Sequence, residues 1–262
     1  MSLRKLQDLS GKIALVTGGS RGLGLQIAEA LGEMGATLEL VARKAAELEQ
    51  ARAHLDAHLD RQGAQAGGTA CDITDPAAVS AMVDAVLVRR GRIDILVNNA
   101  GTTWGAPAED YPLEAWLKVI NLNLNGTFMV TQAVGSRSMI PNRYGRILNI
   151  ASIAGTRGNP PGLLKTIAYN TSKGGIVNFT RALAAEWGAH GITVNAIAPG
   201  FFPSKMTRDS IERHGEELIR RTPLARLGDG EDLKGATVLL CSDASRHITG
   251  QILGIDGGAS IT

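Results

Sequence analysis

The sequence has few cysteines and almost no net charge, and each of these features excludes a class of protein. Its 262 residues include two cysteines, Cys71 and Cys241, without metal-binding spacing, so we expect neither a disulfide framework nor a zinc site. The 27 Lys and Arg residues nearly balance the 25 Asp and Glu residues, and no long basic run occurs. Nucleic acid and anionic membranes are therefore poor candidates as partners.

Long hydrophobic runs are also absent. No window approaches the roughly 18 apolar residues that a membrane-spanning helix needs, and the first residues, MSLRKLQDLSGK, contain no apolar segment typical of a secretion signal. We therefore expect a protein of the reducing cytoplasm. Hydrophobic residues still make up 44% of the chain, which is enough for a large core. Without a linker or an internal repeat, residues 1–262 are expected to form a single domain.

Short apolar runs alternate with longer stretches of helical periodicity, the pattern of a doubly wound α/β fold. The expected strands are Ile13–Thr17, Thr37–Ala42, Ala64–Cys71, Ile93–Val97, Arg146–Ala151, Thr193–Ile197 and Ile252–Ile255. The expected helices are Gly22–Met34, Ala45–Arg61, Pro76–Arg90, Leu113–Met139, Ala168–Gly188 and Glu231–Ser242. Several strands are apolar on consecutive residues, as in a parallel seven-stranded sheet with helices on both faces. Residues 201–223 lack a clear strand or helix pairing and are expected to form a lid.

A glycine-rich loop follows the first strand and opens the first long helix. Its sequence from Gly18 to Gly24 is GGSRGLG, a Gly-x3-Gly-x-Gly spacing. Glycines at such a turn let the backbone approach a pyrophosphate, and the helix N-terminus attracts its charge. Taken alone, the loop is equally consistent with a simple turn before a helix. The strand before it and the helix after it favour dinucleotide binding.

Four motifs in the same order resemble the signature set of the short-chain dehydrogenase/reductase family. They are the loop at residues 17–24, Asn98-Asn99-Ala100-Gly101, the pair Tyr169 and Lys173, and Pro199-Gly200. The resemblance runs from Lys12 to Gly258 and implies an NAD(P)-dependent oxidoreductase for a ketone or secondary alcohol. The cofactor-binding residues that it implies, together with the loop, are Gly18, Ser20, Arg21, Gly22, Leu23, Gly24, Arg43, Asp72, Ile73, Asn99, Ala100, Gly101, Tyr169, Lys173, Pro199, Gly200, Phe202 and Ser204.

The end of the second expected strand favours NADP over NAD. A carboxylate at that position would bind the adenosine ribose and repel a 2′-phosphate, but here the strand ends in Ala42 followed by Arg43. Arg21 in the glycine loop is a second base, and two guanidinium groups can fork onto phosphate oxygens. Glu39 lies in mid-strand and is expected to be structural. The alternative is that both arginines only solvate a surface loop.

Reduction of a carbonyl needs a proton donor, and a free tyrosine with a pKa near 10 is poorly matched to neutral pH. Tyr169 and Lys173 are four residues apart on an expected helix, so the ammonium can favour the phenolate. The resemblance adds Ser152 as the residue that hydrogen-bonds the substrate oxygen, and Asn123 as a residue that organises a water and Lys173 into a proton relay. The expected catalytic set is Asn123, Ser152, Tyr169 and Lys173.

The segment between Ser152 and Tyr169 is a few residues longer than is usual in the family. The extra residues, 158–165, border the expected substrate pocket and leave the substrate open. The stretch RTPLARLGD at residues 221–229 resembles gluconate 5-dehydrogenase-type members, while other features resemble 3-oxoacyl reductases equally well. A ketoreductase and a polyol or sugar-acid dehydrogenase both remain possible, and so does an inactive dinucleotide-binding regulator or scaffold.

Two further expectations concern assembly and metal. Relatives usually form tetramers, and the Ala-, Val- and Leu-rich helices Leu113–Met139 and Ala168–Gly188 offer more apolar surface than one sheet face can cover. We therefore expect a homotetramer. His54 and His58 have a spacing that a metal could use, but no cysteine or carboxylate completes a zinc pattern, so a solvated helix face is favoured.

Overall fold

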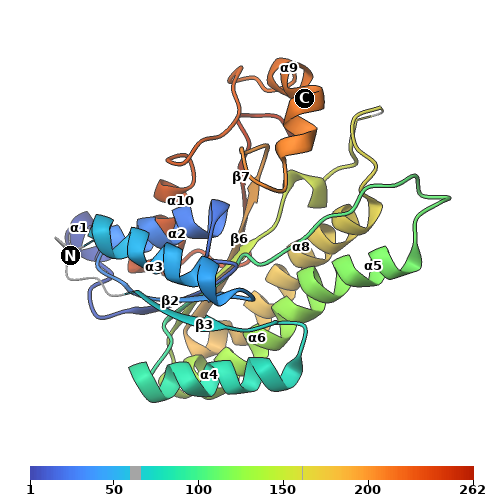
Figure 1. Cartoon of the computed structure of the whole chain (residues 1–262). Coiled ribbons are helices and arrows are strands. Elements are labelled where there is room, and N and C mark those ends of the chain that lie inside the picture. The colour runs from blue at the N-terminus through green and yellow to red at the C-terminus, as the bar shows by residue number, and fades with distance from the viewer. Residues whose placement is uncertain (60–65, 161) are drawn as a thin grey trace.

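Seven short strands form one parallel sheet in the computed structural model, which describes residues 1–59, 66–160 and 162–262 (Figure 1). The strands are β1 (Ile13–Thr17), β2 (Thr37–Ala42), β3 (Ala66–Ala70), β4 (Ile95–Asn98), β5 (Gly145–Ile150), β6 (Ile192–Pro199) and β7 (Ile252–Ile255). Their order in the sheet is β3-β2-β1-β4-β5-β6-β7. The chain therefore reverses direction across the sheet between β1 and β4, and the predicted doubly wound fold is confirmed.

Helices cover both faces of this sheet (Figure 1). They are α1 (Leu3–Gln7), α2 (Gly22–Glu33), α3 (Ala45–Leu59), α4 (Pro76–Arg90), α5 (Leu113–Ile120), α6 (Thr127–Val134), α7 (Ile140–Asn142), α8 (Ile167–Trp187), α9 (Arg208–Arg220) and α10 (Lys234–Cys241). Apolar residues of α2, α3 and α10 pack on one face, and those of α4, α6 and α8 pack on the other. Strand β1 serves both layers, since Ala14 and Val16 join the first and Leu15 joins the second.

Several element boundaries differ from the sequence prediction. Strand β3 is confined to Ala66–Ala70 rather than Ala64–Cys71, while β6 extends to Pro199 because all eight of its residues are buried between helices. Residues 60 and 61 of the predicted second long helix, and residues 64 and 65 of the predicted third strand, lie outside the described residues. Helix α1 was not predicted, because its five residues contain no buried position and so no apolar periodicity.

The predicted helix Leu113–Met139 is continuous but not regular. Two π-helical turns, Asn121–Gly126 and Gly135–Met139, separate α5, α6 and α7. A π turn inserts an extra residue and rotates the side chains that follow, and such turns are frequent at functional sites. The first one carries Asn123, so the departure from α-helical geometry falls on a predicted site residue.

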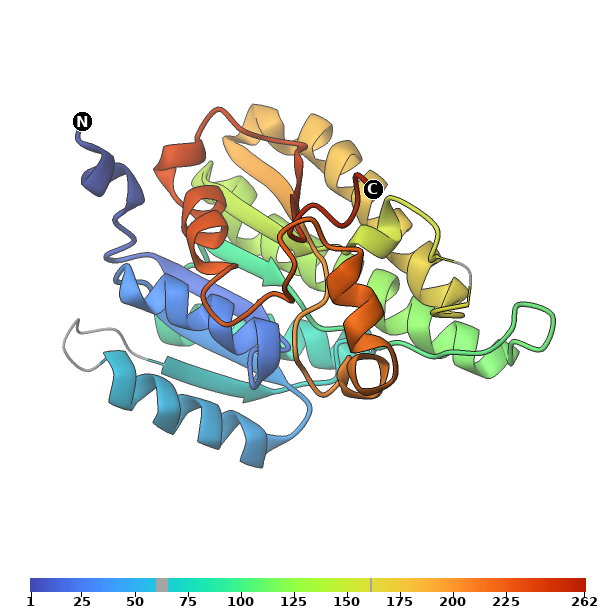
Figure 2. The ribbon, with the colours of Figure 1, turned by 90° about the horizontal axis from the view of Figure 1, so that it is seen from above.

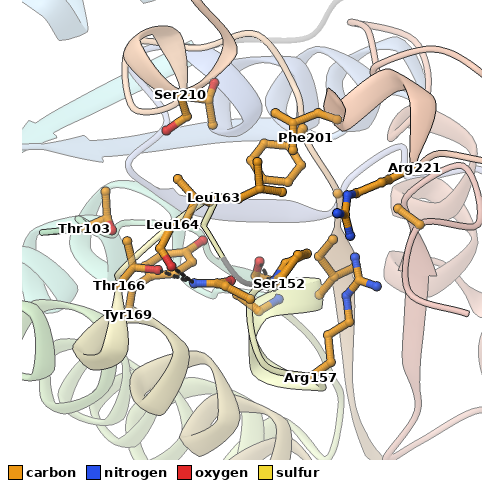
Figure 3. Close-up of a pocket in the computed structure, with 18 of the residues that line it drawn as sticks. Thr103, Ser152, Arg157, Leu163, Leu164, Thr166, Tyr169, Phe201, Ser210 and Arg221 are labelled. Carbon is orange, nitrogen blue, oxygen red and sulfur yellow. Dashed lines mark hydrogen bonds between the residues drawn. The ribbon is translucent and has the colours of Figure 1, made fainter. Parts of the chain in front are cut away.

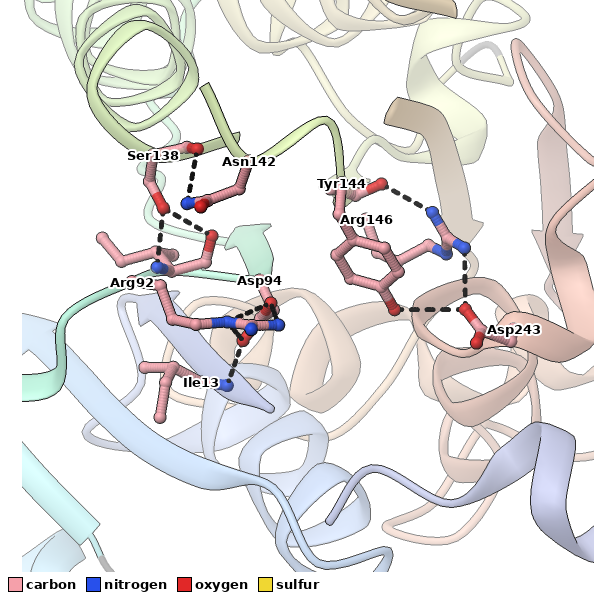
Figure 4. Close-up of polar contacts among 10 residues, drawn as sticks. Ile13, Arg92, Asp94, Ser138, Asn142, Tyr144, Arg146 and Asp243 are labelled. Atoms are coloured by element: carbon pink, nitrogen blue, oxygen red, sulfur yellow. Dashed lines mark hydrogen bonds and ion pairs between the residues drawn. The ribbon is translucent and has the colours of Figure 1, made fainter. Parts of the chain in front are cut away.

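Paired charges close the amino edge of the sheet (Figure 4). The Asp94 carboxylate is buried and accepts hydrogen bonds from the backbone N–H of Ile13, 2.9 Å, and from Arg92. Arg146, also buried, donates to Asp243 at 2.8 Å. Asp94 thus ties β1 to the start of β4, and Arg146 ties β5 to the turn Asp243–Ser245, so that each of these two buried charges has a partner.

The carboxyl edge of the sheet carries the segment 201–223, which contains helix α9. Figure 2 shows α9 on the side toward which the strand arrows point. The helix has one buried residue, Leu218, and seven of its thirteen residues are charged, which explains why no clear apolar helix pattern marked it in the sequence. Among the described residues, no helix is both long and apolar enough to cross a bilayer.

Candidate active site

The four predicted motifs meet at the carboxyl edge of the sheet. Gly18 follows β1, Asn99 follows β4, Ser152 lies just beyond β5, and Gly200 follows β6. Parallel strands end at a common edge, so residues that are far apart in the sequence become neighbours. Doubly wound sheets bind their ligands in a crevice at this edge.

The glycine loop is shaped by close backbone contacts. Gly18 has a φ of +64°, a left-handed conformation that favours glycine, and a Cβ there would lie 2.8 Å from Nδ2 of Asn99. A Cβ on Gly24 would lie 2.3 Å from the carbonyl oxygen of Gly18. The loop therefore folds tightly against itself and leaves the N-terminus of α2 open, which fits a dinucleotide pyrophosphate.

Hydrogen bonds from the Asn98–Gly101 segment hold this loop in place. The Asn99 side chain donates to the carbonyl oxygens of Thr17, 3.1 Å, and Gly18, 3.0 Å. In return, the Thr17 hydroxyl accepts from the backbone N–H groups of Asn99 and Ala100. Asn98 points instead into the sheet and donates to Thr131 and Asn149. The segment thus braces the ends of β1 and β4.

The two predicted phosphate-binding arginines occupy different environments. Arg21 is half-exposed at the start of α2, and its Nη1 lies 3.0 Å from Oε1 of Glu47. Lys44 contacts the same carboxylate oxygen, also at 3.0 Å, and its hydrogen bond holds the pKa of Glu47 below the usual value. Arg43 is exposed and lines a surface cavity together with Asp72. The Arg21–Glu47 pair was missed in the sequence, where the two residues are 26 positions apart.

Asp72 lines this cavity, and the adenine contact expected of Asp72 and Ile73 stays a prediction. The Asp72 carboxylate accepts from the backbone N–H and the hydroxyl of Thr74, and these hydrogen bonds lower the pKa of Asp72. Ile73 is buried. Glu39 is buried in β2 and paired with Arg89 and Arg90 of α4 at 2.8 and 2.7 Å, so its carboxylate cannot meet a ribose at the cleft.

Ser152, Tyr169 and Lys173 come together where β5 ends and α8 begins. Lys173 is buried one helical turn after Tyr169, with its Nζ 5.6 Å from the centre of the tyrosine ring. The Nζ donates a 2.6 Å hydrogen bond to the carbonyl oxygen of Ile150, the last residue of β5. The Ser152 side chain hydrogen-bonds Tyr169 and also accepts from the backbone N–H of Ala154. The three side chains therefore form one polar cluster, in which Ser152 and Lys173 are buried and Tyr169 is partly exposed.

Burial controls the acidity of this cluster. It raises the pKa of Tyr169, and the hydrogen bond from Ser152 offsets only part of that rise. Burial also lowers the pKa of Lys173 to about 8. In this structure Tyr169 is thus less acidic than a free tyrosine, contrary to the sequence expectation, because desolvation of the phenolate outweighs the distant ammonium. A neutral phenol at pH 7 is the form that can donate a proton.

Asn123 is buried in the first π turn and links two elements. Its Oδ1 accepts from the backbone N–H of Thr102 at 2.8 Å, and its Nδ2 donates to the carbonyl oxygen of Thr102 and to the Ser172 hydroxyl, both at 2.9 Å. These contacts connect the segment after β4 to α8 next to Lys173. The predicted relay through water and Lys173 stays a prediction.

A cavity opens above the cluster (Figure 3). Ser152 and Tyr169 lie at its floor, and Phe201 from the segment 201–223 lies opposite them. Met206 from the same segment also lines the cavity. Leu163 and Leu164 from the extra segment 158–165 also line it, while residue 161 of that segment lies outside the described residues. The extra segment therefore borders this cavity, as the sequence predicted for the pocket.

Phe202 and Ser204 differ in how they relate to the cleft. The Phe202 side chain is buried in the core, where its ring fills the space that a Cβ on Gly228 would need. The cofactor contact expected of Phe202 stays a prediction. Ser204 lies near the loop, 4.0 Å from the Cβ position of Gly22, and its hydroxyl contacts Thr207.

Comparison with known proteins agrees with this geometry. A family model described as enoyl-(acyl carrier protein) reductase matches residues 18–260. The chain is 40% identical to gluconate 5-dehydrogenase of Gluconobacter oxydans over the full length of both. It is 38% identical to a 3-oxoacyl-[acyl-carrier-protein] reductase of Pseudomonas aeruginosa, covering 96% of this chain and 98% of the relative. The solved gluconate 5-dehydrogenase of Burkholderia cenocepacia, in complex with NADP and tartrate, superposes with a TM-score of 0.91 at 34% identity and full coverage of both chains.

The chain belongs to the short-chain dehydrogenase/reductase family. The resemblance inferred from the four motifs is thereby confirmed, and the chain is an NAD(P)-dependent oxidoreductase of this family that acts on CH–OH groups. Two arginines, Arg157 and Arg221, line the cavity. The sequence pattern favours a mixed, solvated helix for Arg221, and Arg157 was missed. The only available signal for Arg157 was its position directly before the extra segment.

Lys173→Met is expected to raise the free energy of unfolding at pH 7, because it removes a buried ammonium whose pKa in the fold, about 8, lies below the ordinary 10.5. The unfolded chain binds this proton more tightly than the folded chain does. The loss of folding stability caused by burying the ammonium is therefore greatest below about pH 8, and it vanishes as the pH rises through 10.5. At ~1.4 kcal/mol per pKa unit, the gain is on the order of 3 kcal/mol.

Urea unfolding of cofactor-free protein at pH 7 and at pH 10 measures this effect. Lys5→Met in the exposed helix α1 is the matched control and should change little at either pH. A Lys173→Met variant less stable than the wild type at pH 7, or a gain that is equal at both pH values, contradicts the assigned cost.

Proposed function

We propose that this protein is an NADP-preferring oxidoreductase that interconverts a ketone and a secondary alcohol, with Tyr169 as general acid and base. The observation that carries the proposal is the cluster of Ser152, Tyr169 and Lys173 beside a cavity, near a tight glycine loop. A scaffold that only bound the dinucleotide would need the loop but not a desolvated phenol that faces a cavity.

The residues divide the chemistry as follows. A bound nicotinamide cofactor would supply or accept the hydride, held by the glycine loop, Asp72, Ile73 and the residues around Asn99. Tyr169 donates its phenolic proton to the carbonyl oxygen during reduction, and its raised pKa keeps that proton in place at neutral pH. Ser152 hydrogen-bonds the same oxygen, while the Lys173 ammonium stabilises the phenolate that forms and contacts the ribose. Alcohol oxidation needs the phenolate first, so higher pH favours that direction.

The substrate is a carbonyl or alcohol compound small enough for the cavity. Gluconate oxidation and 3-oxoacyl reduction, the activities named for two relatives, both fit this reaction class. The segment 201–223 supplies Phe201 and Met206 to the cavity wall, and we propose that it acts as a lid.

Tyr169→Phe should lower turnover by about 10²- to 10⁴-fold, because it removes the general acid while the ring still fills its space. NADPH binding should change little. Lys173→Met should also lower turnover, and it should weaken NADPH binding because the ammonium has a second role at the ribose. Fluorescence titration with NADPH alongside steady-state turnover separates the two effects.

Tyr111→Phe is the matched control, since it removes the same hydroxyl from a tyrosine whose partner is the carbonyl oxygen of Trp104 outside the cavity. Near wild-type turnover of Tyr169→Phe would remove this tyrosine from the mechanism. If wild-type protein binds NADPH and turns over no carbonyl or alcohol of a broad panel, the inactive regulator or scaffold is the better description.

Three observations support the preference for NADP. The end of β2 is followed by Arg43 rather than a carboxylate, and Arg21 stands in the glycine loop. The acidic residue of that strand, Glu39, is buried and paired with arginines on α4. A solved relative also holds NADP. Glu47 now contacts Arg21 and Lys44, so a 2′-phosphate would replace this carboxylate as the partner of both cations.

Arg43→Asp should reduce kcat/KM for NADPH far more than for NADH, by about tenfold or more, because a carboxylate repels the 2′-phosphate. Glu47→Gln should shift selectivity the other way, since it removes the competing anion and frees Arg21 and Lys44. Steady-state kinetics with each cofactor measure both shifts. Arg246→Asp, an exposed charge reversal after the amino-edge turn at Asp243–Ser245, is the control. A wild-type preference for NADH, or equal losses on both cofactors, overturns the assignment.

We propose that the protein is a homotetramer in the cytoplasm. Leu113 and Leu117 of α5 and Phe128 of α6 leave 70%, 47% and 49% of their surfaces exposed, and edge strand β7 exposes Leu253. Covering these apolar residues with copies of the same chain would remove them from water. Light scattering should give the mass of a tetramer, and Leu117→Glu should dissociate it, whereas a wild-type monomer at working concentration rules the assembly out. Both free cysteines are buried, in keeping with a reducing compartment.

A further inference from the structure

Two arginines line the cavity that Ser152 and Tyr169 share. Arg157 lies just beyond the short helix Ile153–Gly155, and Arg221 immediately follows α9. Apart from Tyr169, they are the ionisable residues in the described lining, which includes no carboxylate. Figure 3 shows their guanidinium groups turned toward each other at one end of the cavity, with Tyr169 toward the other end.

These two guanidinium groups are incompletely paired. Arg157 pairs with no Asp or Glu side chain of the described residues, and its Nη1 donates to the main-chain oxygen of Thr262, the last residue of the sequence, 3.1 Å. Arg221 uses its Nε on Glu217, a carboxylate that it shares with Arg220. The Nη groups of Arg221 and most N–H donors of Arg157 thus remain for another acceptor. Two like charges that face one space repel each other unless an anion lies between them.

Much of the cavity wall is apolar. Leu163 and Leu164 of the extra segment, Phe201 and Leu218 are among the residues that line it. Apolar walls exclude water, and a charge-assisted hydrogen bond is stronger where water is excluded. Arg157 is half-buried in this cavity, whereas Arg221 leaves 47% of its side-chain surface exposed.

We infer that Arg157 and Arg221 form an anion subsite that binds a carboxylate or phosphate group at the far end of the substrate. The inference rests on the proposed function, because it places the reacting carbon at Ser152 and Tyr169. The substrate class is then an oxo or hydroxy acid, or a corresponding phosphate ester, whose anionic end is separated from its reacting carbon. Leu163 and Leu164 would then contact the part of the substrate that joins its anionic end to its reacting carbon.

Kinetics with matched substrates test the subsite. Arg157→Met and Arg221→Met should each raise KM for an anionic oxo acid by about 10- to 100-fold, the loss expected for one charge-assisted contact, with kcat within a few-fold. KM for the neutral amide of the same compound should stay unchanged, and Arg157→Lys should restore part of the affinity by keeping the charge without the fork. Arg213→Gln on the exposed side of α9 removes a charge outside the cavity and is the control.

A binding measurement separates failure of the subsite from failure of the proposed reaction. Calorimetric titration of NADPH-loaded protein with succinate, which carries no reducible group, and separately with inorganic phosphate needs no turnover. Binding by the wild type that is lost in Arg157→Met, with NADPH affinity unchanged, supports the subsite even where no substrate is turned over. The anion that binds more tightly identifies the carboxylate or the phosphate class.

Equal KM values for the acid and its amide, together with no anion binding by active wild-type protein, overturn the inference. An effect of Arg213→Gln as large as that of Arg157→Met also overturns it, because general surface charge would then account for both. Melting temperatures will show whether each variant folds. If Arg157→Met does not fold, the Arg157→Lys variant still tests the subsite.

Discussion

The hydrogen bonds between Thr17 and Asn99 are the constraint on which the rest of the site depends. They join the ends of β1 and β4, the two strands between which the chain reverses direction across the sheet. Asn99 also donates to the carbonyl oxygen of Gly18, so the same side chain fixes the glycine loop. A parallel sheet opens a crevice only at such a reversal. One asparagine therefore sets both the position of the crevice and the shape of its phosphate cradle.

Desolvation makes the cluster of Tyr169 and Lys173 costly. The two side chains are neighbours in a space where the neutral phenol and the neutral amine are both favoured. The fold tolerates the ammonium by giving it the carbonyl oxygen of Ile150 as a partner. In the proposed reaction, a neutral phenol beside a partly destabilised cation would be biased toward giving up a proton, which carbonyl reduction requires.

The features that could be predicted from the sequence are those that depend on residues close together along the chain. The strand pattern, the glycine loop and the Tyr169–Lys173 spacing each need only a few neighbouring residues, and the structure contains all of them. The missed features join distant residues: Glu47 with Arg21, Phe202 with Gly228, and Arg157 with Arg221. The acidity of Tyr169 was also misjudged, because spacing along a helix says nothing about how completely the fold removes water from a side chain.

The amino and carboxyl edges of the sheet differ in how some of their charged side chains are paired. At the amino edge, Asp94 is paired with Arg92 and Arg146 with Asp243, so the buried charges there are balanced within the chain. At the carboxyl edge, Arg43 and Arg157 pair with no Asp or Glu side chain of the described residues. Paired charges add rigidity where the fold needs it, and unpaired cations gain a partner only when an anion arrives. An anionic ligand at the carboxyl edge would give Arg43 and Arg157 the partner that no described Asp or Glu side chain supplies.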